Sequence, residues 1–188
     1  MSPYGDTEDI LTFAHEFGHY ADALINYNAY ETIDLSECYS QAMEYLVLFY
    51  LQEAVSEEDL ANLWNMKMFD TLDLYVQQCS FAEFESIAYA LGADNLSAEV
   101  LNELSLRLSK EYGYFEEGWE EYYAMSWSDI PHFFDSPFYV VSYPISNDIA
   151  LQLYELEKAE SGAGVDKLCQ MLPRQFEGLM DTALDAGL

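Results

Sequence analysis

The sequence predicts an all-α fold that forms a single helical domain over residues 1–188, and three observations support this. Hydrophobic residues recur at helical spacing along most of the chain, whereas no segment shows the apolar and polar alternation of a β-strand. The five prolines stand mostly at the edges of these periodic segments. A hydrophobic content of 51 % is enough to fill one core of ordinary size.

The first two predicted helices carry most of the residues that bear on function. The first runs from Thr7 or Asp9 to about Leu24, with Thr7 as N-cap and acidic residues at the positive end of the helix dipole. A polar loop, NYNAYET, leads to a second helix that begins near Asp34 and continues through SECYSQAMEYLVLFYLQEAV. Because this segment is apolar on nearly every side, we expect the second helix to lie at the centre of the fold.

The rest of the chain also has a helical pattern. Ser56 and the acidic residues after it open a third helix, SEEDLANLWNMKMFDTLDLYVQQ, and the segment SFAEFESIAYAL is helical up to Gly92. LSAEVLNELSLRLSKEYG forms another helix that ends at Gly113. The aromatic stretch YFEEGWEEYYAMSWSDIPHFFDSPFY is broken enough to be loop in part, and helices return at about 147–158 and 165–186.

The charge of the chain limits the partners that it can bind. Six basic and 35 acidic residues give a net charge of −29, which repels nucleic acid and anionic membranes and attracts cations and basic peptides. Solubility or adaptation to salt explains this charge equally well. The longest apolar run, residues 45–51, is too short to span a bilayer, and the N-terminus does not have the pattern of a signal peptide.

The cysteines indicate a reducing compartment. Cys38, Cys79 and Cys169 are odd in number and widely spaced, and they form no CxxC pair. This usage predicts reduced, mostly buried thiols and a cytoplasmic protein.

Two of the three histidines lie one helical turn apart, in the sequence HEFGH. His15 and His19 share one face of a helix, and Glu16 stands beside them. This is the arrangement of a zinc-binding helix that carries its own general base. Histidines at this spacing also occur as hydrogen-bonded core residues. However, burying unpaired ionisable groups costs several kcal/mol, and a divalent cation offsets that cost.

The second helix supplies a candidate third ligand. Catalytic zinc takes three protein ligands and leaves a fourth position for water. Glu37 and Glu44 are seven residues apart on one helix face, and a short connection favours antiparallel neighbours. We predict Glu37 as the ligand and Glu44 as a hydrogen-bond partner of a ligating imidazole. The run Asp34-Leu35-Ser36-Glu37 also fits a capping box, in which Glu37 would tie back to the helix start.

These motifs resemble those of the oligoendopeptidase F branch of the thimet-oligopeptidase family of zinc peptidases. DILTFAHEFGHYADA and SECYSQAMEYL resemble its two active-site helices, and Glu37, Ser40 and Glu44 match its pattern E-x-x-S-x-x-x-E. CSFAEFES at 79–86 resembles a run typical of the branch, and WSDIPHFFDSPFYVVSY at 127–143 resembles its late active-site segment. The resemblance covers nearly the whole chain but only the C-terminal part of the longer family proteins.

The resemblance implies a zinc-dependent endopeptidase or oligopeptidase, a hydrolase of short peptides with one Zn²⁺ per chain. His15, His19 and Glu37 would bind the metal, which lowers the pKa of its bound water. Glu16 would accept a proton from that water and deliver it to the leaving amine.

The late segment is expected to stabilise the oxyanion of the tetrahedral intermediate. The resemblance implies His132 as the first donor, Tyr139 as the second and Tyr143 as the third. Without the resemblance, His132 is a histidine packed among phenylalanines, and the tyrosines are ordinary core residues in a chain with 16 of them. Val141 stands where the family often has a tyrosine, and Pro144 is expected to bend the following helix.

A second class of function stays open: a truncated relative that keeps the zinc helices as structure, or as a peptide-binding or regulatory module. The intact Glu16 favours the enzyme, whereas the lack of the family's N-terminal helices favours the module. Without those helices an apolar patch should remain, covered by a homodimer or by the rest of a larger protein. In FAEFE we expect the phenylalanines in the core, whereas the sequence indicates no role for Glu83 and Glu85.

Overall fold

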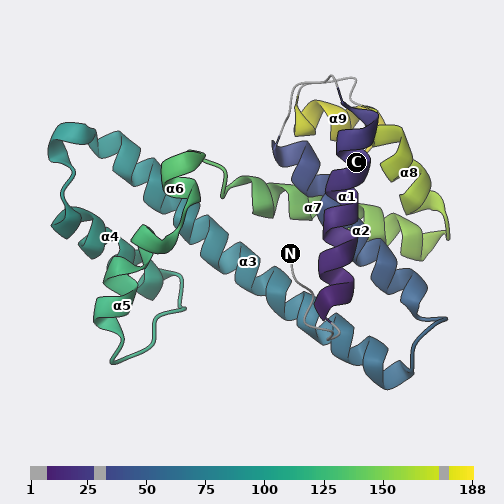
Figure 1. The fold of residues 1–188 in the computed structure, drawn as a ribbon, viewed down its shortest axis with the longest axis horizontal. Helices are drawn as coiled ribbons and strands as arrows, with labels where there is room; N and C mark the ends of the chain where they lie inside the picture. The colour runs from purple at the N-terminus through teal and green to yellow at the C-terminus, as the bar shows by residue number, and fades with distance from the viewer. Residues whose placement is uncertain (1–7, 28–32, 174–177) are drawn as a thin grey trace. The chain divides into compact units, whose positions relative to one another are not determined.

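The computed structural model describes residues 8–27, 33–173 and 178–188. Every regular element in these ranges is a helix, which confirms the all-α prediction (Figure 1). The chain divides into two compact units, one formed by Met1–Phe69 with Ile145–Leu188 and the other by Asp70–Pro144. Among the described helices, none is both long enough and apolar enough to cross a membrane.

The first unit is built around its second helix. Its elements are α1 (Glu8–Ile25), α2 (Ile33–Leu51), the beginning of α3 (Glu57–Leu91), most of α7 (Ser142–Ala159), α8 (Ala163–Met171) and α9 (Leu179–Ala186). Residues 37–42 of α2 are all buried, as expected for a central helix. The expected N-cap Thr7 and most of the NYNAYET loop lie outside the described residues.

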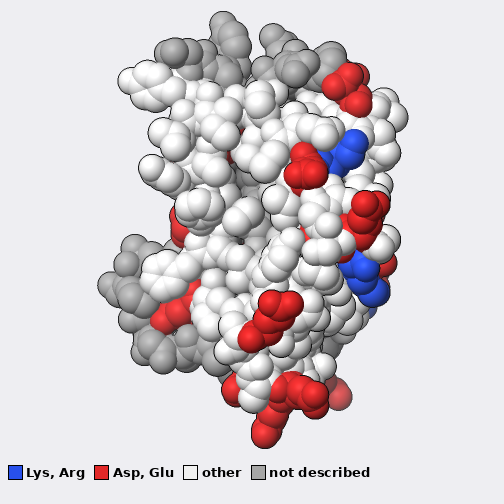
Figure 2. All heavy atoms as spheres, turned by 90° about the vertical axis from the view of Figure 1, so that its right-hand side faces the viewer, with Lys and Arg blue, Asp and Glu red and all other residues white. Residues whose placement is uncertain are grey.

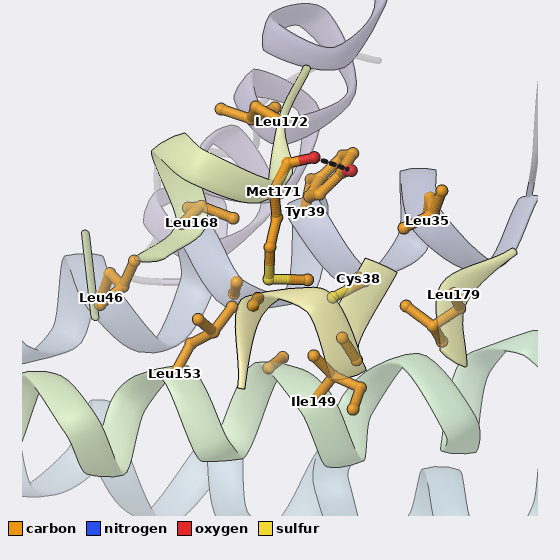
Figure 3. Close-up of a cluster of buried hydrophobic side chains, with 14 of the residues drawn as sticks. Leu35, Cys38, Tyr39, Leu46, Ile149, Leu153, Leu168, Met171, Leu172 and Leu179 are labelled. Carbon is orange, nitrogen blue, oxygen red and sulfur yellow. Dashed lines mark hydrogen bonds between the residues drawn. The ribbon is translucent and has the colours of Figure 1, made fainter. Parts of the chain in front are cut away.

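The core of this unit joins α2 to the C-terminal helices (Figure 3). Leu35, Tyr39 and Leu46 of α2 contribute to one cluster with apolar side chains of α7, α8 and α9. The hydroxyl of Tyr39 donates a 2.7 Å hydrogen bond to the carbonyl oxygen of Met171, drawn as a dashed line in Figure 3. The metal-binding helices predicted from the sequence therefore rest on a core made largely of residues beyond 145.

The second unit has an aromatic core. It contains the rest of α3 with α4 (Ala98–Glu111), α5 (Glu120–Met125), α6 (His132–Asp135) and the 3-10 helices Ala93–Asn95 and Ser126–Asp129. Phe84 stacks on Phe133 with ring centroids 5.0 Å apart, and Leu104 and Leu108 of α4 pack with Phe84. The aromatic stretch that was predicted to be loop in part forms α5, the 3-10 helix Ser126–Asp129, α6 and the turns between them.

Three helix boundaries differ from the sequence prediction. The third helix and SFAEFESIAYAL form one helix, α3, because no glycine or proline separates them. Ser80, at the junction of the two segments, is buried, and its hydroxyl is hydrogen-bonded to that of Tyr114 at 2.9 Å. The helix predicted for 165–186 is divided into α8 and α9, and Pro173 lies between them. The helix predicted for about 147–158 begins earlier, because α7 starts at Ser142. Pro144 therefore lies in its first turn, where a proline breaks no backbone hydrogen bond of the helix.

Acidic side chains are spread over the surface. On the face shown in Figure 2 they are separated by broad uncharged areas and accompanied by few basic side chains. One basic residue, Lys67, is only 4 % exposed and therefore adds little to the surface charge.

Helices α1 and α2 cross in close contact because Gly18 has no side chain (Figure 1). A Cβ on Gly18 would lie 2.4 Å from the Cα of Ser40 and 2.7 Å from the carbonyl oxygen of Tyr39. These backbone atoms cannot rotate away, so the main chains of the two helices touch at this point.

Replacing Gly18 by alanine should therefore destabilise the protein, even though alanine favours a helix over glycine by about 1 kcal/mol. Overpacking of a closed contact outweighs that gain, and we expect a net loss of about 2 kcal/mol or more in the free energy of unfolding, measured with urea. Gly178→Ala, at the N-cap of α9, is the control for a methyl group added without a clash, because its Cβ would meet only Asp181 Oδ2 at 3.9 Å. Equal stability of the two variants would contradict the close contact.

Candidate metal centre

The crossing of α1 and α2 brings the predicted ligands together. His15 lies opposite Glu44, and His19, one turn later, lies opposite Ser36, as expected of helices that run in opposite directions. Glu37 lies between these two positions on α2 and is 2 % exposed. The three potential ligand atoms, one each from His15, His19 and Glu37, all lie within 4.8 Å of one another.

The distances between these ligand atoms fit a small tetrahedral cation. The Nε2 atoms of His15 and His19 are 3.1 Å apart, and the carboxylate oxygens of Glu37 lie 3.7 Å and 3.9 Å from them. Zinc bonds of about 2.0–2.1 Å in tetrahedral geometry hold ligand atoms about 3.4 Å apart. The three side chains thus surround a space that such an ion fills with only small adjustments.

The other ring nitrogen of each histidine is held by a neighbour on α2. Nδ1 of His15 lies 2.7 Å from Oε1 of Glu44, and Nδ1 of His19 lies 2.9 Å from Oγ of Ser36. With the proton on Nδ1, both Nε2 atoms present a lone pair to the shared space. Such partners fix the tautomer and the orientation of metal-ligating imidazoles.

Glu44 is itself held by Lys67 of α3. The ammonium group of Lys67 donates a 2.6 Å hydrogen bond to Oε2 of Glu44 and lies 4.4 Å from the centroid of the Tyr45 ring. The sequence interpretation missed both Lys67 and Ser36. A signal for Lys67 existed, because it falls at four-residue spacing between Leu63 and Thr71, which are also buried.

The electrostatics of the centre favour positive charge. Burial alone would lower the pKa of His15, but its hydrogen bond to Glu44 and the charges of Glu44, Glu37 and Glu16 raise it above the ordinary 6.5. Burial alone would raise the pKa of Glu44, but the bonds to His15 and Lys67 and their charges hold it below the ordinary 4.5. A site that stabilises a proton in this way also attracts a metal cation.

The structure also places the remaining predicted residues of the first unit. Glu16 is exposed on α1 directly after His15. The capping-box alternative for Glu37 is not supported, because α2 begins at Ile33 and the Glu37 carboxylate faces the imidazoles. Cys38, next to Glu37, is fully buried, and burial raises the pKa of its thiol to about 12.

The predicted oxyanion donors form a cluster within the second unit. The ring of Tyr139 stacks on His132 with centroids 4.3 Å apart and planes 6° from parallel. The hydroxyl of Tyr143 lies 3.4 Å from Nε2 of His132. His132 and Tyr143 line a hollow of about 370 Å³ together with residues of α3 such as Asp73 and Gln78. The cluster can thus offer an imidazole and two phenol groups from one short segment.

Helices that present HExxH and a following glutamate to one space define a class of helical metallopeptidase folds. A model of peptidase family M3 matches residues 6–172, and the chain belongs to this family. This confirms the family that the sequence motifs predicted.

A solved structure gives the same assignment for the fold. The chain is similar to the crystal structure of oligoendopeptidase-F from Enterococcus faecium, with a TM-score of 0.74 and 23 % sequence identity. The similarity covers 96 % of this chain and 34 % of that chain, so this chain spans about a third of its length. No curated protein matches the sequence.

The His15–Glu44 pair should stabilise the metal-free protein within a limited pH range. The raised pKa of His15 favours the folded state below about pH 6.5, and this contribution is lost as the pH rises through the raised value. The lowered pKa of Glu44 favours the folded state above about pH 4.5, and this contribution is lost as the pH falls through the lowered value. The gain is therefore largest between these limits.

Urea denaturation of the metal-free protein at about pH 5.5 and about pH 8.5 tests this range, with Glu44→Gln as the comparison. General repulsion among the acidic residues changes with pH in both proteins alike. We expect the stability difference between the two pH values to be smaller in Glu44→Gln. The same difference in both proteins would contradict the role of the pair.

Proposed function

We propose that this chain is the catalytic part of a zinc-dependent endopeptidase that hydrolyses short peptides. The observation that carries this proposal is the convergence of His15 Nε2, His19 Nε2 and the Glu37 carboxylate on one space. Two nitrogen donors and one carboxylate are a ligand set typical of catalytic zinc, with a further position left for water. Membership of peptidase family M3 supports the reaction class.

In this proposal the metal, when bound, polarises the substrate carbonyl and makes water acidic. Glu16 takes a proton from the water that attacks the carbonyl carbon. The C–N bond of the resulting tetrahedral intermediate then breaks, and Glu16 returns the proton to the leaving amine. His132, Tyr139 and Tyr143 are proposed to donate hydrogen bonds to the oxyanion, where preorganised donors contribute most.

The acidic surface supports a proposal about the substrate. A net charge of −29 attracts peptides that carry lysine or arginine. The cytoplasm is proposed as the place of action from the cysteine usage of the sequence alone. The expectation of mostly buried thiols is wrong, because only Cys38 is buried, whereas Cys79 is partly exposed and Cys169 is exposed.

Exposed apolar side chains support a proposal about assembly. On α1 four of them recur at helical spacing, each more than half exposed: Phe13, Phe17, Tyr20 and Leu24. Phe17 also borders a hollow of about 460 Å³ with apolar residues of α2 and α8. We propose that a second copy covers this stripe in a homodimer, and expect a dimer in sedimentation velocity at micromolar concentration. A clean monomer would instead favour covering by further residues of a longer protein.

The alternative is a relative that keeps the site as structure, or as a peptide-binding or regulatory module. The two proposals differ in the behaviour of Glu16, which a structural or binding site does not need. Glu16 therefore provides the decisive experiment.

His19→Ala should lose the metal, whereas Glu16→Gln should keep about one zinc per chain and lose several orders of magnitude in peptidase rate. The reason is that the proposal gives Glu16 the role of general base and not that of a metal ligand. Zinc content and cleavage of a quenched fluorescent peptide library measure the two properties separately. Zinc-loaded wild-type protein without any cleavage would favour the binding module, and stoichiometric zinc in His19→Ala would refute the ligand assignment.

Peptides with lysine or arginine should be cleaved faster than acidic peptides of equal length, and the preference should shrink as salt rises. At 0.1 M ionic strength, the interaction between exposed charges that are more than about 10 Å apart is largely screened. The ratio of kcat/KM for the two peptides at several salt concentrations measures the effect. A ratio that does not change with salt would leave solubility as the explanation for the charge.

A further inference from the structure

Phe138 has a backbone conformation that its side chain does not favour. Its φ is 62°, and no other non-glycine residue within the described ranges has a positive φ. A residue with a Cβ is strained in this region, so the surrounding structure must hold it there. Phe138 is 45 % exposed, so deep burial of the residue does not explain the conformation.

Glu85 of α3 holds the backbone of Phe138. Its Oε1 accepts a 2.9 Å hydrogen bond from the Phe138 N–H, although the two residues are 53 positions apart in the chain. Glu85 is only 2 % exposed, and its Oε2 has no hydrogen-bond partner among the described residues. A buried carboxyl group with half of its acceptors unused is costly, which indicates a specific use for the bond that it makes.

The same helix also holds the side chain of Phe138. Tyr89, one turn after Glu85, packs its ring against that of Phe138 with centroids 5.0 Å apart. Two successive turns of α3 thus fix the backbone and the ring of one residue. The strained conformation is therefore determined by two independent contacts.

The conformation of Phe138 directs the next residue. The N–H of Tyr139 donates to the carbonyl oxygen of Ser136 at 3.0 Å, which closes a tight turn around Phe138. From this turn the ring of Tyr139 lies flat on His132, with the planes 6° from parallel. A change of φ at Phe138 would rotate Tyr139 away from His132.

We propose that Glu85 is a positioning residue, which fixes the turn at Phe138 so that Tyr139 stacks on His132 in the geometry needed for oxyanion binding. The proposal rests on the proposed peptidase function for its purpose, but the positioning itself is independent of activity. It gives the second glutamate of FAEFE a role through its contact with Phe138. The first glutamate, Glu83, has a different partner, the hydroxyl of Tyr112 at 2.9 Å.

The positioning is tested by NMR of the His132 ring protons, because the stacked ring of Tyr139 shifts their resonances. The chain has three histidines, and His132→Ala assigns the signal. In Glu85→Leu the signal should move toward its position in Tyr139→Leu, while the signals of His15 and His19 stay in place. Glu85→Gln keeps an acceptor oxygen and should retain most of the wild-type shift, and Glu83→Leu is the matched control that should retain all of it.

Glu85→Asp covers the case in which Glu85→Leu does not fold, since it keeps the carboxyl group but shortens its reach by one methylene. A folded Leu or Asp variant with an unchanged His132 signal would overturn the proposal. If neither the Leu nor the Asp variant folds, the proposal is also overturned, because Glu85 would then be needed for the fold as a whole and not only for the position of Tyr139.

Peptide cleavage tests the purpose of the positioning. We expect Glu85→Asp to lower kcat about tenfold or more with little change in KM, as Tyr139→Phe should, because both disturb groups that act on the transition state. An altered His132 signal without any wild-type cleavage would overturn the proposed peptidase function while leaving the positioning intact. An altered signal with unchanged kcat would overturn the catalytic purpose of Glu85.

Discussion

The contact of main chain with main chain at Gly18 is the constraint on which the metal centre depends. Gly18 lies between the two histidines in HEFGH, so its backbone contact with α2 lies between the ligands of α1. With a side chain there, α1 would move away from Ser40, and the imidazoles would move away from Glu37. The short distances between ligand atoms follow from this approach, because histidine and glutamate side chains have fixed reach.

A second constraint is the row of charges behind the ligands. His15, Glu44 and Lys67 come from three helices and are joined by hydrogen bonds of 2.7 Å and 2.6 Å. Each of these groups would be costly to bury alone, but together they compensate one another. The row fixes the direction of the His15 ring, so the centre is arranged before a cation arrives. It also joins α3 to the pair of helices that carry the ligands.

Much of the fold and of the metal centre could be predicted from the sequence because the evidence for them is local. Helical periodicity defines α1 and α2, and the four-residue spacing of His15 and His19 fixes a shared face. The prediction of one continuous helix over 165–186 was wrong, although the sequence holds a local signal against it, because Pro173 lies just beyond the end of α8.

The contacts that join distant segments could not be predicted in this way. Lys67 meets Glu44 across 23 positions, and Glu85 meets Phe138 across 53. Pro137 fits the second position of a tight turn, but the residue type of Phe138 does not indicate a positive φ, since it is neither glycine nor asparagine. The strain is imposed by α3, and only the folded structure shows it.

The burial of Cys38 has a consequence for the chemical resistance of the centre. Because burial raises the pKa of its thiol to about 12, Cys38 carries almost none of the reactive thiolate at pH 7. Oxidants and alkylating reagents therefore have almost nothing to attack beside Glu37, whereas Cys169 is exposed on α8. A protein of this kind can carry a fluorescent or spin label at Cys169 while the thiol next to the ligands stays unmodified.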